Sequence, residues 1–228
     1  MLYFRKVGPA SHKLIFFACW ITKAATFAAL QYLPIAAEGA ALTRGKVVTI
    51  KRLLLLSGPV RSGKSSVAQV LKTDHGFHGI STGGYLRSYV RPGAGDITRS
   101  WLQDLGDQLD LKTDFAWVVD SVAIPAVKAA PATESWLLDA VRKPRQVEHF
   151  RAQFPYVVRH VHLHAPESVL QARYGAGLSS GDPIYSLAIA HPNEVAARSL
   201  GIFADQIFDT EQASASEIAE QIVSLWRE

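Results

Sequence analysis

The chain has 228 residues, of which 48% are hydrophobic and 19% charged, a balance that suits one globular domain with a sizeable core. Its single cysteine, Cys19, excludes an internal disulfide and suits a reducing compartment, so we expect a cytoplasmic protein. Residues 1–46 hold six basic residues and one acidic residue, whereas residues 47–228 hold 18 basic and 19 acidic residues. The near-neutral second part argues against a nucleic-acid partner.

The first 46 residues are expected to lie outside the folded domain, which we place at residues 47–228. Their apolar run is interrupted by Lys23, and a charge near the centre of a membrane span costs about 2.5–3.5 kcal/mol, which argues against a membrane segment. Met1 is the only methionine, and Val47 or Val48 could each be encoded by an alternative start codon. We favour a mis-assigned start or a disordered extension over a membrane or interfacial anchor, and both over an export signal.

The most specific motif is G-P-V-R-S-G-K-S at residues 58–65, which fits G-x-x-x-x-G-K-[ST]. It stands between an expected strand at 52–57 and an expected helix at 63–73. This arrangement turns backbone N–H groups toward an anion, so we expect the segment to bind the phosphates of ATP. Lys64 would reach the terminal phosphates and the Ser65 hydroxyl would bind Mg²⁺. The expected nucleotide-binding residues are Gly58, Pro59, Val60, Arg61, Ser62, Gly63, Lys64, Ser65 and Ser66.

Strand and helix patterns alternate along the whole of the remaining chain. The expected strands are 52–57, 77–80, 136–139, 156–164 and 206–209. The expected helices are 63–73, 85–90, a helix that includes 101–109 and is capped by Thr98, 114–129 with a bend at Pro125, 146–154, 167–174 with Pro166 at its first position, 194–200 and 216–226. Residues 175–193 are expected to form a loop. The alternation predicts an α/β fold with a five-stranded parallel sheet flanked by helices. Together with the motif at residues 58–65, it favours a three-layer P-loop NTPase fold with a short lid.

Polar residues at the carboxyl ends of these strands mark the expected site, because ligands of such sheets bind there. Asp139 ends the strand at 136–139 and is the natural carboxylate for Mg²⁺ beside Ser65, although it could instead cap the following helix. His160, His162 and His164 share one face of a strand, but the sequence offers no acidic or cysteine partner nearby, so we do not expect a metal site there. The tryptophans at 101, 117, 136 and 226 are expected in the core.

Four segments resemble the nucleoside monophosphate kinases, in order and in approximate spacing. Residues 81–87, S-T-G-G-Y-L-R, resemble the acceptor element S-T-G-D-x-L-R, and residues 137–146, L-L-D-A-V-R-K-P-R-Q, resemble L-L-D-G-F-P-R-x-x-x-Q. Residues 158–173 resemble the strand and helix that lead to the lid, and residues 204–210 are similar to A-D-x-V-I-x-N. The resemblance covers about residues 50–227, and the spacing from Asp139 to Arg142 looks closer to deoxynucleotide and dephospho-CoA kinases.

This resemblance implies a set of site residues. Thr82 and Arg87 would hold the base edge and the phosphate of an acceptor nucleotide, Arg142 would clamp phosphate, and Gln146 would bind the acceptor base. Arg173 would lie over the adenine or the phosphates of ATP. The catalytic residues would be Lys64, Arg87, Arg142 and Arg173, with no general base needed if the acceptor is an ionised phosphate.

The sequence also departs from the family pattern. Gly84 replaces an acidic residue and Ala140 a glycine, and residues 175–192 contain no lysine or arginine. Gly177 stands where a second lid arginine is expected, and losing such an arginine can cost about 10³–10⁵ in rate. The candidate substitutes are Arg61, Arg91, Arg99, Arg145 and the later Arg198.

We therefore expect an ATP- and Mg²⁺-dependent phosphotransferase that acts on a nucleoside monophosphate or a similar small phosphorylated acceptor. Its partners would be small-molecule nucleotides, and its oligomeric state is left open. Two alternatives remain. One is a nucleotide-binding regulatory module with weak or no kinase activity. The other is a kinase of small metabolites such as sugar acids or shikimate.

Overall fold

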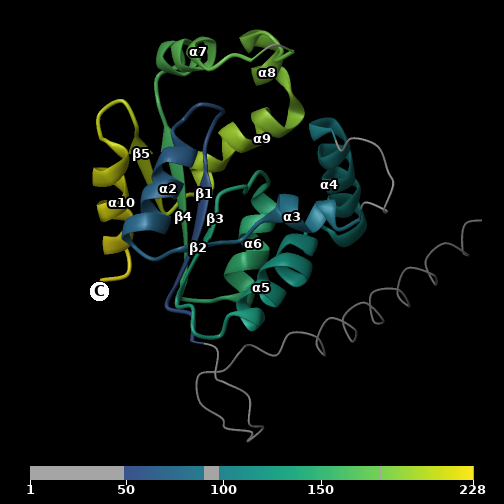
Figure 1. Cartoon of the computed structure of the whole chain (residues 1–228), viewed down its shortest axis with the longest axis vertical. Coiled ribbons are helices and arrows are strands. Elements are labelled where there is room, and N and C mark those ends of the chain that lie inside the picture. Colours follow the sequence, from purple (N-terminus) through teal and green to yellow (C-terminus); the bar gives the residue numbers. More distant parts are fainter. Residues whose placement is uncertain (1–48, 90–97, 180, 228) are drawn as a thin grey trace, which may run out of the picture. The chain divides into compact units, whose positions relative to one another are not determined.

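A computed structural model of the chain describes residues 49–89, 98–179 and 181–227 (Figure 1). The hypotheses for residues 1–46 and the candidate Arg91 lie outside the described residues.

The centre of the fold is a sheet of five parallel strands, and the expected alternation of strands and helices is confirmed. The strands are β1 (Arg52–Ser57), β2 (His78–Gly79), β3 (Ser135–Leu138), β4 (Val158–His164) and β5 (Gln206–Asp209), in the spatial order β2-β3-β1-β4-β5. Strand β1 pairs with β3 on one side and β4 on the other, so that Leu54 lies opposite Leu137 and Arg159. This central position explains why residues 53–56 form an unbroken leucine run.

The helices cover both faces of the sheet (Figure 1). They are α2 (Lys64–Asp74), α3 (Thr82–Arg87), α4 (Arg99–Thr113), the π-helical segment η1 (Val118–Ala123), α5 (Ile124–Ala129), α6 (Pro144–Gln153), α7 (Glu167–Ala176), α8 (Tyr185–Ala190), α9 (Pro192–Ser199), the 3₁₀ turn η2 (Leu200–Phe203) and α10 (Ala215–Ser224). Leu53 and Leu55 pack with η1, α5 and α6, whereas Leu54 and Leu56 pack with α2 and α10. Successive side chains of β1 thus enter two separate cores, which produces the three layers.

Several boundaries differ from the sequence-based expectations. The segment 175–193, expected to be a loop, contains α8, and α9 begins at Pro192 because the His191 side chain accepts a hydrogen bond from the Asn193 N–H. Helix α3 begins at Thr82, since the Ser81 hydroxyl caps it by accepting from the Gly84 N–H.

The expected helix at 114–129 was wrong at its start. Asp114 and Phe115 both adopt positive φ angles, 49° and 65°, so α4 ends there and the next helical segment begins only at Val118. Two side-chain expectations also differ. Trp101 is 39% exposed, so it is not a core residue, and Pro166 precedes α7 as its N-cap.

No helix among the described residues combines the length and apolarity that a bilayer crossing needs.

Candidate functional site

The segment between β1 and α2 forms a tight loop that only glycine permits at two positions. Gly58 has a φ of 143°, and a Cβ atom there would lie 2.4 Å from the Leu163 carbonyl oxygen of β4. Gly63 has a φ of 84° and precedes the first turn of α2. Arg61 also adopts a positive φ, 63°, an unusual conformation for a residue with a side chain. The loop conformation is therefore fixed by the backbone of the motif.

Lys64 is the first residue of α2, and its ammonium points back into the loop. Its Nζ atom donates to the carbonyl oxygens of Gly58 and Pro59, each at 2.6 Å, and lies 3.4 Å from the Ser62 hydroxyl. Burial lowers the pKa of Lys64 to about 8, an effect that the negative charge of Glu194 opposes. The cation is thus held inside the loop, at the place where phosphate oxygens would lie.

A cavity of about 1210 Å³ opens over this loop at the carboxyl ends of the strands. Its volume exceeds the range of about 300–1,000 Å³ typical of small-molecule pockets. Most of the sequence-predicted site residues line it, namely Gly58, Val60, Arg61, Gly63, Lys64, Ser65, Ser66, Asp139, Arg142 and Arg173. Pro59 and Ser62 do not line it, and Ser62 is completely buried although it belongs to the loop itself.

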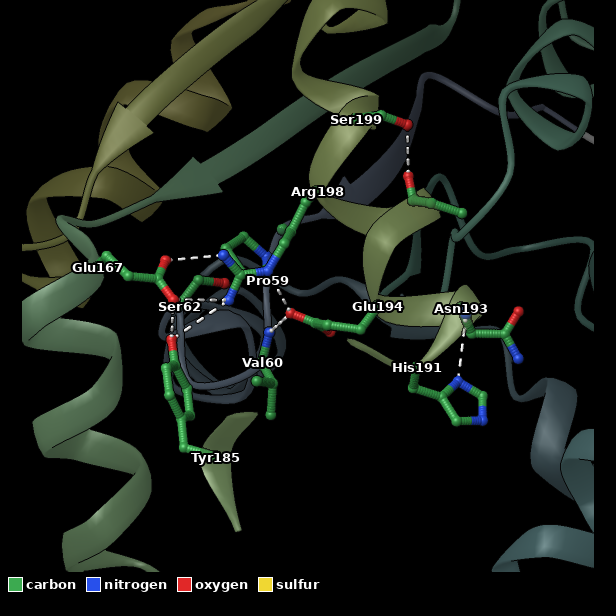
Figure 2. Close-up of polar contacts among 12 residues, drawn as sticks. Pro59, Val60, Ser62, Glu167, Tyr185, His191, Asn193, Glu194, Arg198 and Ser199 are labelled. Carbon is green, nitrogen blue, oxygen red and sulfur yellow. Dashed lines mark hydrogen bonds and ion pairs between the residues drawn. The ribbon is translucent and has the colours of Figure 1, made fainter. Parts of the chain in front are cut away.

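The Glu194 carboxylate of α9 contacts a backbone N–H group of the loop (Figure 2). Glu194 Oε1 accepts a hydrogen bond of 2.7 Å from the Val60 backbone N–H and one of 3.1 Å from Arg198 Nε. Arg198 Nη1 also donates to Glu167 of α7 at 2.7 Å, and the Tyr185 hydroxyl of α8 donates to the Glu167 carboxylate at 2.6 Å. The three helices over the loop are therefore joined by one polar network, and Glu194 is the member that touches the loop.

Ser65 and Asp139 are the residues that could hold Mg²⁺. Both line the large cavity, one at the start of α2 and the other directly after β3. Asp139 is half-exposed, and Lys72 Nζ lies 3.8 Å from its Oδ2 atom. No group of three or more histidine, cysteine, aspartate or glutamate side chains gathers anywhere in the described ranges. One hydroxyl and one carboxylate fit Mg²⁺, which commonly takes its other ligands from phosphate and water.

Arg173 of α7 is connected to the loop through Thr210. Its guanidinium donates to Thr210 Oγ1 and to the Thr210 carbonyl oxygen, both at 2.8 Å. A Cβ atom at Gly63 would lie 3.5 Å from the Thr210 methyl group, so this threonine borders the loop. Arg173 is thus held beside the loop by Thr210, and its position relative to ATP stays a prediction.

A second cavity, of about 210 Å³, lies between α3, α4, η1 and the start of α6. Thr82, Arg142 and Gln146 line it, as does Asp110. Four residues, Gln103, Ala140, Arg142 and Asn193, line both cavities. The smaller cavity therefore adjoins the larger one at Arg142.

Two of the predicted acceptor residues are placed differently from the rest. The Gln146 amide is engaged within the protein, since Oε1 accepts from the Arg142 N–H at 3.1 Å and Nε2 lies 3.4 Å from Asp110 Oδ1. Arg87 lines neither cavity. It is exposed, and a Cβ atom at Gly83 would lie 3.2 Å from its Nη1 atom.

Arg61 stands out among the cations considered as replacements for a lid arginine, because it lines the large cavity. Its guanidinium donates to the Gly177 carbonyl oxygen and lies 5.9 Å from the centre of the Tyr174 ring. A Cβ atom at Gly177 would lie 2.5–2.6 Å from the guanidinium atoms of Arg61. The guanidinium thus fills the space that a side chain at position 177 would take.

Two of the other candidates, Arg145 and Arg198, are engaged in ion pairs, and the side chain of Arg99 lies outside what the structure describes. Arg145 binds Asp114 and Glu148, and it lines neither cavity. Arg198 is bound to Glu194 and Glu167.

Sequence reasoning did not find Glu194 or Asp110. Glu194 meets Val60 across 134 residues, and nothing in the sequence around either residue indicates that contact. Asp110 reads as an ordinary polar position on an amphipathic helix. Its only signal is that it stands seven residues before Trp117, whose indole N–H donates a hydrogen bond to it.

The chain was also compared with known proteins. No protein-family model matches it. No curated protein matches it either. Among solved structures, it is similar to shikimate kinase from Acinetobacter baumannii in complex with shikimate, with 18% identity over 78% of this chain and 93% of that one and a TM-score of 0.47.

Two further structures show similar values. The YorR protein of Bacillus subtilis in complex with phosphorylated GDP has 20% identity over 76% of this chain and 94% of that one, with a TM-score of 0.44. The APS kinase CysC of Mycobacterium tuberculosis in complex with AMPPNP and APS has 15% identity over 79% and 99%, with a TM-score of 0.44.

Proposed function

We propose that this protein is an ATP-dependent phosphotransferase that moves the γ-phosphate to a nucleoside monophosphate or a similar small phosphorylated acceptor. The observation that carries the proposal is the meeting of two cavities at Arg142, one built over the phosphate loop and the other walled by α3 and α4. A transferase needs this arrangement because donor and acceptor must lie side by side with their reacting oxygens in line.

The loop amides and Lys64 would bind the phosphates of ATP. To do so, the Lys64 ammonium exchanges its contacts with the Gly58 and Pro59 carbonyl oxygens for phosphate oxygens. Ser65 and Asp139 would hold Mg²⁺, which when bound neutralises charge on the β- and γ-phosphates. Arg173 and Thr210 would border the nucleoside side of the same cavity.

The acceptor phosphate would lie at Arg142, where both cavities open. Such a phosphate is already ionised at neutral pH, so an oxygen of the acceptor can attack without a general base. Arg61 would supply the positive charge that the lysine- and arginine-free segment 175–192 does not, since its guanidinium lies on Gly177 at the cavity wall. Positioning and charge neutralisation account for most of the catalysis of such transfers.

An assay of ADP release with a panel of monophosphates tests the proposal. We expect ADP formation to depend on the acceptor and to disappear in Lys64→Ala. Tight ATP binding with no release of ADP for any acceptor would contradict it. Sugar acids and shikimate belong in the same panel, because a preference for one of them would identify a small-metabolite kinase instead.

A second candidate function has one observation in its favour. The Glu194 carboxylate accepts a hydrogen bond from a loop amide that phosphate would use, and Arg198 is paired with it. A regulatory module would keep this contact as a barrier to turnover and would bind nucleotide without an acceptor-dependent rate. The same assay separates the two functions, because only a transferase shows acceptor dependence.

A further inference from the structure

Among the described residues, only one carboxylate oxygen of Asp110, Oδ1, has a hydrogen-bond partner. The residue is 6% exposed, and its Oδ1 atom accepts from Trp117 Nε1 at 2.7 Å and lies 3.4 Å from Gln146 Nε2. The Oδ2 atom has no hydrogen-bond partner among the described residues, yet none of their fully buried side-chain polar atoms lacks a partner. Oδ2 therefore reaches accessible space, and the space that Asp110 lines is the 210 Å³ cavity.

The walls of this cavity suit a flat ring. Trp117 is fixed by its bond to Asp110 and by Tyr85, whose ring is stacked on it at 5.7 Å between centroids. Leu86, Leu102 and Val118 add apolar surface. Gly83 and Gly106 also line the cavity, and because they have no side chains they leave its space open. The volume is below the range of about 300–1,000 Å³ of whole-ligand pockets, so the cavity takes a ring-sized part of an acceptor.

Four charged residues line this cavity, namely Asp107, Asp110, Arg142 and Lys143, and the charges of Lys143 and Asp107 both act on Asp110. Arg142 lines the cavity where it meets the larger cavity, whereas Asp110 lines only the smaller one. A phosphate bound at Arg142 leaves the ring of the acceptor to face Asp110. Burial raises the pKa of Asp110, and the hydrogen bond from Trp117 and the charge of Lys143 oppose that rise, so a ligand that donates a hydrogen bond to the carboxylate offsets part of its desolvation.

We propose that Asp110 is a specificity-determining residue and that the acceptor is a monophosphate of a base with an exocyclic amino group. This inference rests on the proposed function and names its acceptor more closely. An ionised carboxylate only accepts hydrogen bonds, so its free oxygen can bind the amino group of cytosine, adenine or guanine. The O4 carbonyl of uracil or thymine presents a lone pair where cytosine presents its amino group, so the carboxylate would face an acceptor at that position.

Calorimetric binding of CMP, AMP, GMP, UMP and dTMP, in the presence of an unreactive ATP analogue, tests this assignment without requiring turnover. Asp110→Asn keeps the acceptor for the Trp117 indole and turns the free oxygen into an amide donor. We expect this variant to bind at least one amino-bearing monophosphate about 10–100-fold more weakly and to bind UMP or dTMP as well as or better than the wild type. Asp104→Asn is the same substitution at an exposed position of α4 outside both cavities. It should leave the affinities for both the amino-bearing monophosphates and UMP or dTMP unchanged.

The variant must also bind the ATP analogue as the wild type does, which shows that its phosphate loop is folded. Equal affinity of the wild type for amino and carbonyl bases, or an equal loss for all five monophosphates in Asp110→Asn, would overturn the assignment. So would stronger binding of a hydroxylated acid than of any monophosphate. Specific binding of an amino-bearing monophosphate without any phosphoryl transfer would instead refute the proposed function and leave the role of Asp110 intact.

Discussion

At the scale of single residues, we expect the protonation of Lys64 to control how tightly the loop binds phosphate. Because its pKa is lowered to about 8 by burial, the side chain is charged below that pH and neutral above it in the free protein. The triphosphate is fully ionised throughout this range and favours the charged form, so binding above pH 8 requires the uptake of one proton. Affinity for an unreactive ATP analogue should therefore fall about tenfold per pH unit from pH 8 to pH 10.

Titrations at several pH values measure this slope. Lys64→Arg serves as the control, since arginine stays charged and should give weaker binding that changes little with pH. A flat profile in the wild type would mean that Lys64 does not neutralise the bound phosphates.

Arg61 gives a second prediction at this scale. Arg61→Ala should lower the turnover number by about 10²–10³-fold, the loss typical of removing one preorganised charge-stabilising group, with a much smaller effect on ATP binding. Gly177→Ala should act in the same direction, because a methyl group there would lie 2.5 Å from the Arg61 guanidinium and displace it. Gly175→Ala is the matched control, since a Cβ atom at Gly175 has no neighbour within 4 Å. Equal activity of Gly177→Ala and Gly175→Ala would argue against a role for Arg61.

At the scale of elements, α9 contacts the loop of the motif through Glu194, which should oppose the binding of phosphate there. Phosphate oxygens must displace the Glu194 carboxylate from the Val60 N–H, and two anions at one amide repel each other. Glu194→Gln keeps the size of the side chain and removes its charge, so the variant should bind an ATP analogue about three- to tenfold more tightly.

Calorimetry on this variant measures the effect, with Glu220→Gln, an exposed position of α10, as the control. Weaker nucleotide binding in Glu194→Gln would show that the carboxylate supports the bound state, for instance by holding Arg198 over it.

The elements themselves were predictable where local pattern and tertiary packing agree. The leucines of β1 alternate between two cores, so every position is apolar and the strand is evident from the sequence. Helix α8 was missed because the preceding residues are rich in glycine and serine and because none of its own residues is buried. The turn at Asp114 and Phe115 was missed since both residues adopt left-handed backbone angles that a sequence does not reveal.

The candidate site divides in the same way. Lys64, Ser65 and Asp139 line the large cavity, and this placement could be predicted because the motif and the strand end fix their positions locally. Their roles stay predictions. Asp110 and Glu194 act through partners on other elements, and no local signal announces such contacts. Arg87 was expected at the acceptor, yet it lies outside both cavities in this structure, so its role stays a prediction.

At the scale of the whole molecule, a buried histidine pair beneath the phosphate loop should govern stability in mild acid. The Ser57 hydroxyl lies 2.7 Å from His160 Nε2 and 2.9 Å from His162 Nδ1, and His160 Nδ1 lies 3.1 Å from the Phe203 carbonyl oxygen. Because that carbonyl can only accept, His160 carries its proton on Nδ1, accepts from Ser57 at Nε2, and leaves Ser57 to accept from His162. This chain of bonds is complete with both rings neutral.

Burial lowers the pKa of both histidines, that of His162 to about 4. As the pH falls below 6.5 the unfolded chain takes up these protons first, so stability is lost from pH 6.5 down to about 4. His162 alone accounts for about 3 kcal/mol over that window. The free energy of unfolding, measured with denaturant at pH 7, 6 and 5, should show this loss of stability. The loss should be smaller in His162→Asn and unchanged in His164→Asn, which alters an exposed position. An unchanged slope in His162→Asn would exclude this origin.

The account as a whole depends on a phosphate site formed by the loop and Lys64, and calorimetric titration with the Mg²⁺ complex of an unreactive ATP analogue tests it most directly. We predict saturable binding to the wild type with one nucleotide per chain, and a loss of roughly 10–100-fold or more in affinity for Lys64→Ala, as expected for a charge-assisted contact. No binding to the wild type, or equal affinity in the two proteins, would contradict the account.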